Sequence, residues 1–168
     1  MKTFNIDLKD YNTPRDICTV MADEKCKHYT YTFHYGSKII KHGKASDKEW
    51  QTGTWGNRIY RQAGGIPGWD YGELDDTSAR EMRKGMEKCF PSVSRRDVII
   101  TVYDYTSDLA GKTEEEIDHV LLNEEHELVK QHLAEHGAPP PLNVQGTRTR
   151  TKPNLDLFSF DDDEGDVE

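Results

Sequence analysis

A long helix that is marked at both ends constrains the fold of this chain more than any other feature. Thr113 and Glu116 form a capping-box pattern, in which each side chain accepts a hydrogen bond from the other residue's backbone N–H. Gly137 supplies the stop, and three prolines follow it. We therefore predict one helix that begins after Thr113 and runs to about Glu135.

The other elements follow from two kinds of pattern. Runs rich in aromatic and β-branched residues predict strands, and apolar residues at helical spacing predict helices. A tight turn at Gly36 and Ser37 joins two of the strands into a hairpin. The result is an α/β fold with a small central antiparallel sheet of about three strands, flanked by helices. The predicted strands are Tyr29–Tyr35, Lys38–His42 and Asp97–Tyr105, and the predicted helices are Asn57–Ala63, with Asn57 as its N-cap, and Ser78–Phe90.

Length and charge indicate one folded domain with two different ends. The 168 residues suffice for one domain, which we assign to residues 29–147. Residues 1–28 are poorly patterned and are interpreted as an N-terminal arm, and residues 148–168 as a basic extension with a disordered acidic tail. Removing the seven acids from Asp156 to Glu168 leaves 24 acidic against 22 basic residues, so the body can still present a local basic face.

Composition also excludes some classes of protein. No stretch approaches the roughly 18 apolar residues of a membrane helix, and the first ten residues lack the apolar run of a signal peptide. An odd number of cysteines, three, favours a reducing compartment. We therefore expect a cytoplasmic protein without a membrane partner, and the sequence leaves its oligomeric state open.

One acidic residue on the long helix needs an explanation beyond folding. At about 100° per residue, Glu125 lies within about 20° of the mean direction of the apolar arc, and Glu124 lies near its edge. A carboxylate on a buried face is costly unless it is paired or binds a cation. Glu125 is therefore predicted to pair with a buried arginine, to lie where the arc leaves the protein, or to hold a metal ion. The arc consists of Ile117, Val120, Leu121, Leu122, Leu128, Val129 and Leu133.

The order of short motifs along residues 29–143 resembles that of the GIY-YIG nucleases. In that family, two short motifs lie on adjacent strands about ten residues apart. Tyr31 lies at the position of the first motif's tyrosine, and Lys41-His42-Gly43 lies at the position of the second motif. Two departures are that Gly-Ile does not precede Tyr31 and that Lys41 replaces a tyrosine, as it does in some restriction-type members.

The later motif positions also have counterparts. The segment GNRIYRQ supplies Arg58, with Arg61 beside it, and Gln62 lies where many members have His or Tyr. Glu125 opens an E-x-x-L-V pattern, and Asn143 follows the proline-rich turn.

The resemblance implies a metal-dependent endonuclease that hydrolyses phosphodiester bonds of DNA. Tyr31 would take the proton from water, Lys41 would favour its phenolate, and His42 would be a second proton relay. Arg58 would clamp the phosphate through its planar fork of donors. Glu125 would hold Mg²⁺ or Mn²⁺.

The same resemblance implies residues that contact the nucleic acid, with DNA as the partner. Asn143 would orient Glu125 or a bound water. The DNA-contacting residues would be Arg61, Asn143, Arg148 and Arg150.

Other interpretations remain open. Tyr31, Lys41 and Arg58 can be explained as a strand aromatic, a solvated lysine and a helix cap. His42 can be explained as a partly buried histidine of a strand. The chain can be a non-catalytic nucleic-acid-binding protein of the same fold, with aromatic residues such as Tyr60 and Trp69 stacking on bases. It can also be a protein-interaction module whose acidic tail mimics DNA. That tail could dock on the chain's own basic face or on a protein partner.

Overall fold

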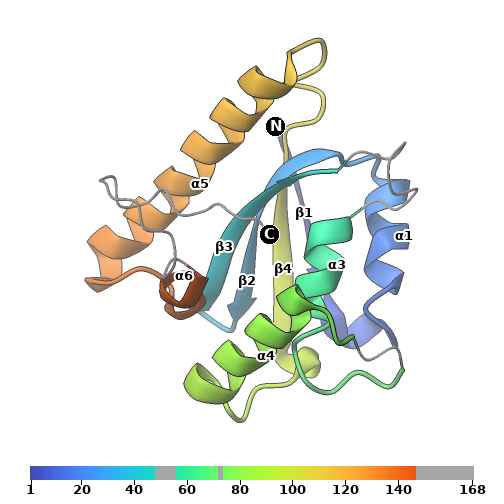
Figure 1. The fold of residues 1–168 in the computed structure, drawn as a ribbon, viewed down its shortest axis with the longest axis vertical. Helices are drawn as coiled ribbons and strands as arrows, with labels where there is room; N and C mark the ends of the chain where they lie inside the picture. Colours follow the sequence, from blue (N-terminus) through green and yellow to red (C-terminus); the bar gives the residue numbers. More distant parts are fainter. Residues whose placement is uncertain (48–55, 72–73, 147–168) are drawn as a thin grey trace.

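The centre of the molecule is a four-stranded antiparallel sheet. The computed structural model describes residues 1–47, 56–71 and 74–146. Within them, the strand order is β1-β4-β2-β3 (Figure 1). The hairpin β2–β3 pairs Tyr31 with Gly43, and β4 lies between β2 and β1. The strands are β1 (Lys2–Asp7), β2 (His28–Tyr35), β3 (Lys38–Ser46) and β4 (Val98–Asp104).

Helices lie on both faces of this sheet. In Figure 1, α5 runs diagonally along one side of the hairpin, and α1, α3 and α4 lie on the other side. The short α6 contacts both β3 and α4. None of the described helices is long and apolar enough to cross a membrane. The helices are α1 (Asp16–Asp23), α3 (Asn57–Ala63), α4 (Thr77–Cys89), α5 (Glu114–His136) and α6 (Pro141–Gly146), with 3-10 turns η1 (Leu8–Asp10) and η2 (Arg95–Asp97).

The predicted α/β class is confirmed, but the sheet has one strand more than expected. The first residues are not an arm outside the fold, because Lys2–Asp7 pairs with β4 along its whole length and α1 follows. The strand signal was overlooked: Phe4, Ile6 and Leu8 alternate with polar residues and pack in or against the main core, although only Ile6 is fully buried within the strand itself.

The predicted signals at both ends of the long helix are confirmed. The Thr113 hydroxyl accepts from the Glu116 N–H at 3.1 Å, and the Glu116 carboxylate accepts from the Thr113 N–H at 3.0 Å. Gly137 follows the helix in the left-handed region with φ 77°. One smaller expectation is wrong. The N-cap of α3 is Gly56 rather than Asn57.

The two faces of the hairpin differ in chemistry because side chains alternate along a strand. Tyr29, Tyr31 and Phe33 are buried in the main core together with residues of α1, α3 and α4. Thr30 and Thr32 point to the opposite face, where α5 lies. The aromatic face therefore supplies most of the apolar burial, and the α5 face is largely polar.

Candidate functional site

The candidate site lies where Tyr31 crosses the edge strand β3. Gly43 is the register partner of Tyr31, and a Cβ at Gly43 would lie 2.4 Å from the Tyr31 ring. The missing side chain therefore makes room for the ring to lie across β3. Lys41 and Lys44 leave β3 on opposite faces, because they are three residues apart in a strand. The site consequently involves both faces at this edge of the sheet.

The Tyr31 hydroxyl is buried and has partners on α3. It donates to Gln62 Oε1 at 2.9 Å, and Arg58 hydrogen-bonds to it. Burial raises the pKa of Tyr31 above its ordinary value, Arg58 partly offsets this by its charge and hydrogen bond, and Glu125 raises the pKa further. Lys41 was the cation expected to favour the Tyr31 phenolate. In the structure that cation is Arg58, and burial outweighs it.

Glu125 reaches the same region from α5. Its Oε1 atom is buried and has no hydrogen-bond partner within the described residues. Burial raises the pKa of this carboxyl, and the charges of Lys44, Arg58 and Lys41 act in the opposite direction. Residues from β2, β3, α3 and α5 thus interact electrostatically, and one carboxylate oxygen among them has no hydrogen-bond partner within the described residues.

The neighbouring acid on α5 has a different role. Glu124 accepts a hydrogen bond from the Tyr105 hydroxyl at 3.1 Å, on the side of α5 that faces β4. The two consecutive glutamates point about 100° apart around the helix, so each meets different residues.

The donor set fits a divalent ion that is held only in part by the protein. Among the described residues, no group of three or more His, Cys, Asp or Glu side chains forms a metal site. Mg²⁺ is commonly held by one or two carboxylates together with water and substrate phosphates. Glu125, with its unbonded buried oxygen, fits the first of these roles. The lysines and Arg58 around it oppose a cation until an anionic phosphate is also present.

His42 and Asn143 do not join this cluster through their side chains. The His42 ring bonds to Thr32 Oγ1 at 2.8 Å and lies on the face opposite Tyr31, because it is one residue from Gly43. Burial, and secondarily His132, lower the pKa of His42 to about 3, so its ring is neutral. Asn143 accepts from the His42 N–H at 2.8 Å and donates to its carbonyl at 3.0 Å. The Asn143 amide therefore holds β3 in place rather than facing Glu125.

The remaining predicted DNA contacts have varied positions. The Arg61 side chain is half-exposed and lies 3.5 Å from a carboxylate oxygen of Asp76 at the start of α4. Arg148 and Arg150, like the acidic tail, lie outside the described residues. The base-stacking interpretation needs exposed rings, and the Tyr60 ring is 8% exposed.

Two residues that contact members of the candidate site were not predicted from the sequence. Gln62 could have been found, because it lies four residues after Arg58 and so on the same face of the helix. Asp47 is buried just beyond β3 and accepts from the Tyr29 hydroxyl at 3.0 Å. Nothing in its sequence neighbourhood marks it.

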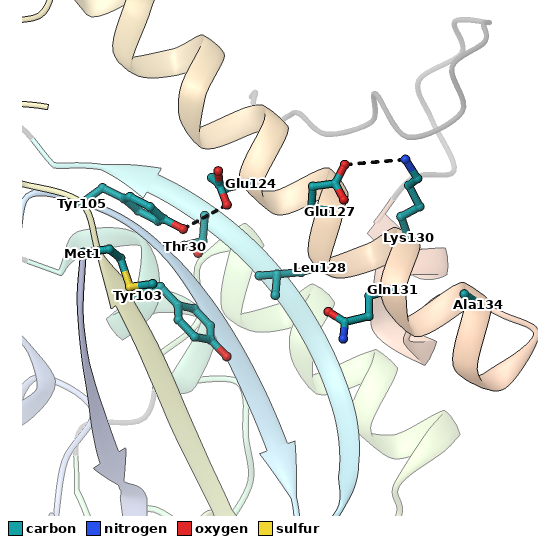
Figure 2. A pocket seen from close by; sticks show the side chains of 10 residues that line it. All are labelled: Met1, Thr30, Tyr103, Tyr105, Glu124, Glu127, Leu128, Lys130, Gln131 and Ala134. Atoms are coloured by element: carbon teal, nitrogen blue, oxygen red, sulfur yellow. Dashed lines mark hydrogen bonds and ion pairs between the residues drawn. The ribbon is translucent and has the colours of Figure 1, made fainter. Parts of the chain in front are cut away.

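A separate groove of about 500 Å³ lies between α5 and the end of β4. Figure 2 shows the Tyr103 and Tyr105 rings on the sheet side and Leu128 and Gln131 on the helix side. Its walls carry two carboxylates and the Lys130 ammonium, which forms an ion pair with one of them. An acidic groove disfavours a phosphodiester backbone, so we do not assign DNA cleavage to it. The lining residues are Met1, Thr30, Tyr103, Tyr105, Glu124, Glu127, Leu128, Lys130, Gln131 and Ala134.

Comparison with known proteins does not provide a family for this chain. It matches no protein-family profile, no curated protein sequence and no solved structure.

Proposed function

We propose that this protein is a metal-dependent endonuclease that hydrolyses phosphodiester bonds of DNA. The observation that carries the proposal is the convergence of Tyr31, Arg58 and Glu125, which are far apart in the sequence and interact within one cluster. These are the three residues that the resemblance to the GIY-YIG nucleases assigns to proton transfer, phosphate binding and metal binding. Chance convergence of the three is a weaker explanation than a shared site.

The proposed residue roles follow from the proton and charge transfers that phosphodiester hydrolysis requires. Water must lose a proton to attack phosphorus, and Tyr31 as phenolate is the group that accepts it. The new P–O bond forms as the bond to the leaving oxygen breaks, and that oxygen then takes a proton from solvent. Arg58 and the two lysines neutralise charge on the phosphate oxygens during this exchange.

The metal ion would be held by Glu125 together with the substrate phosphate, and when bound it would supply charge neutralisation at the scissile group. The protein's own residues do the rest. Arg58 both bonds to the Tyr31 hydroxyl and acts on Glu125. Loss of Arg58 therefore disturbs the proton acceptor and the phosphate clamp together.

The proposal is tested by incubating supercoiled plasmid DNA with the full chain in Mg²⁺, in Mn²⁺ and in chelator. We expect nicked or linear DNA with either metal and intact DNA with chelator. Persistence of supercoiled DNA under every divalent metal, at protein concentrations that bind the plasmid, would reject the enzyme and favour a nucleic-acid-binding protein. Equal cleavage in chelator would reject the metal requirement.

A further inference from the structure

Asp47 is a buried acid that connects β3 to the start of α3. It follows the last residue of β3 and is 7% exposed. Its Oδ2 atom accepts from the Gly56 N–H at 2.6 Å and from the Tyr29 hydroxyl at 3.0 Å. Its own N–H donates to the Lys27 carbonyl at 2.7 Å, so the backbone that carries the carboxylate is itself fixed.

The first of these bonds bears on Arg58. The helix α3 has seven residues, and its N-cap Gly56 provides no side-chain bond of its own. Asp47 supplies the missing acceptor from another element, and a further backbone bond reaches it from Asn57. Arg58 directly follows Asn57. The bonds that Asp47 accepts therefore fix the backbone position from which the Arg58 side chain extends.

Gly56 cannot readily be replaced at this point. Its φ of 69° lies in the left-handed region, and a Cβ there would lie 2.6 Å from Met21 Cγ. Packing against α1 on one side and the Asp47 carboxylate on the other therefore determine where α3 starts.

The second bond bears on Tyr31. Tyr29 and Tyr31 lie on the same face of β2, with ring centroids 6.0 Å apart. Asp47 holds the Tyr29 ring by its hydroxyl, and the Tyr29 ring is one wall of the space that Tyr31 occupies. One carboxylate thus supports the neighbours of both the proton acceptor and the phosphate clamp.

We propose that Asp47 is a positioning residue, which sets the place of Arg58 through Gly56 and supports Tyr31 through Tyr29. This rests on the proposed phosphodiester cleavage, because it names the residue that holds that site's arginine in place. Asp47 touches neither substrate nor metal in this role.

The test uses the full chain with Asp47→Ala, Asp47→Asn and the control Ser94→Ala. Ser94 also caps a short helical turn, η2, which carries no residue of the proposed site. With Mg²⁺ and a DNA duplex, we expect Asp47→Ala to lower kcat/KM about 10- to 100-fold, because small misplacement of a positioned group is costly. Asp47→Asn should recover part of the rate, since its amide oxygen can still accept from Gly56.

A double-mutant cycle separates positioning from general damage to the fold. If Asp47 acts through Arg58, Asp47→Ala should cause little further loss in an Arg58→Ala background. Losses that multiply, or a loss no greater than that of Ser94→Ala, would overturn the proposal. If Asp47→Ala does not fold, the same comparison is made with Asp47→Asn, and a wild-type rate in that variant together with independent losses would count against it.

A second readout does not depend on cleavage. The Nε–H signal of Arg58 is followed by NMR while inorganic phosphate is added. We expect Asp47→Ala to shift this signal and to weaken its response to phosphate, whereas Ser94→Ala leaves it unchanged. An Arg58 signal identical to that of the wild type would overturn the positioning role even if the wild type cleaves DNA. Absence of cleavage by the wild type, with the expected change in the Arg58 signal, would reject only the proposed activity.

Discussion

Asp47 is buried and Glu125 is partly buried with one buried carboxylate oxygen, and burial raises the pKa of each, yet their surroundings differ. The Asp47 oxygen Oδ2 accepts two hydrogen bonds, from a backbone N–H and a phenol. The Glu125 oxygen Oε1 accepts none within the described residues, and the positive charges of Lys44, Arg58 and Lys41 act on the carboxyl. A buried carboxylate with its bonds made has a structural task, and one with a bond left open is suited to a ligand.

The largest effect should come from removing the open carboxylate. We expect Glu125→Gln to lower DNA cleavage by about 10³-fold, because the site loses the charge that would hold the metal. The matched control is Glu124→Gln, whose hydrogen-bond partner is Tyr105, which takes no part in the proposed site. Gel-based cleavage rates compare the two, with DNA binding measured in parallel. The contrast between the two acids fails if Glu124→Gln is the more damaging change.

The next effect concerns Tyr31, whose phenol must lose its proton to act. Because its pKa lies above the ordinary value near 10, the cleavage rate should rise about tenfold per pH unit between pH 7 and 9. Tyr31→Phe should lower the rate by at least about 10²-fold and abolish this slope. Lys41→Met should leave the slope in place, since Arg58 is the neighbouring cation that acts on the phenol. A flat pH profile in the wild type would contradict proton transfer to Tyr31.

The third effect is on stability and concerns Asp47. Burial raises its pKa from 3.8 to about 6, against hydrogen bonds from Tyr29 and Gly56 that lower it. The folded protein thus holds this proton more tightly than the unfolded chain, so the stability due to Asp47 is present below about pH 4 and is lost as pH rises through about 6. Relative to wild type, Asp47→Asn should gain about 2 to 3 kcal/mol of unfolding free energy between pH 4 and 7.

Urea unfolding at several pH values measures this difference, and Ser94→Ala serves as a control with no titrating group removed. If the difference in unfolding free energy between Asp47→Asn and wild type does not vary with pH, folding does not change the pKa of Asp47. Burial would then not explain the properties of the Asp47 carboxylate.

The smallest effect concerns Asn143, an amide with both polar atoms bonded to the His42 backbone. Asn143→Ala should lower the unfolding free energy by about 1 to 2 kcal/mol, the usual cost of leaving buried groups unbonded. Affinity for DNA at fixed salt should change little. A large loss of affinity with unchanged stability would restore Asn143 as a DNA contact.

Elements defined by local signals were predictable from the sequence. The hairpin, α3, α4, β4 and the capped α5 all have their pattern within a few residues, and the structure agrees with them to within a few positions. Strand β1 could have been predicted as a strand, because Phe4, Ile6 and Leu8 alternate with polar residues, but its place in the sheet could not. Its partner β4 is distant in the sequence, so only the tertiary fold identifies it.

Some residues of the candidate site could likewise be predicted from local sequence patterns, and others could not. Glu125 was singled out by its place on the apolar arc, and the structure gives it a buried, unbonded oxygen. His42 was assigned a proton relay, and strand alternation turns its ring to the other face. Asp47 was missed because its partners, Tyr29 and Gly56, are brought to it by folding and not by spacing.

The pairing of β1 with β4 has a consequence for the order in which the chain folds. Lys2 pairs with Asp104, so the first strand has no partner until nearly two thirds of the sequence is present. The β2–β3 hairpin and the helices close over short loops and can form early, whereas closing the loop from β1 to β4 loses more chain entropy. During synthesis, β1 therefore remains unpaired until β4 has been made. β4 pairs with both β1 and β2, so its synthesis is the late step that joins β1 to the hairpin.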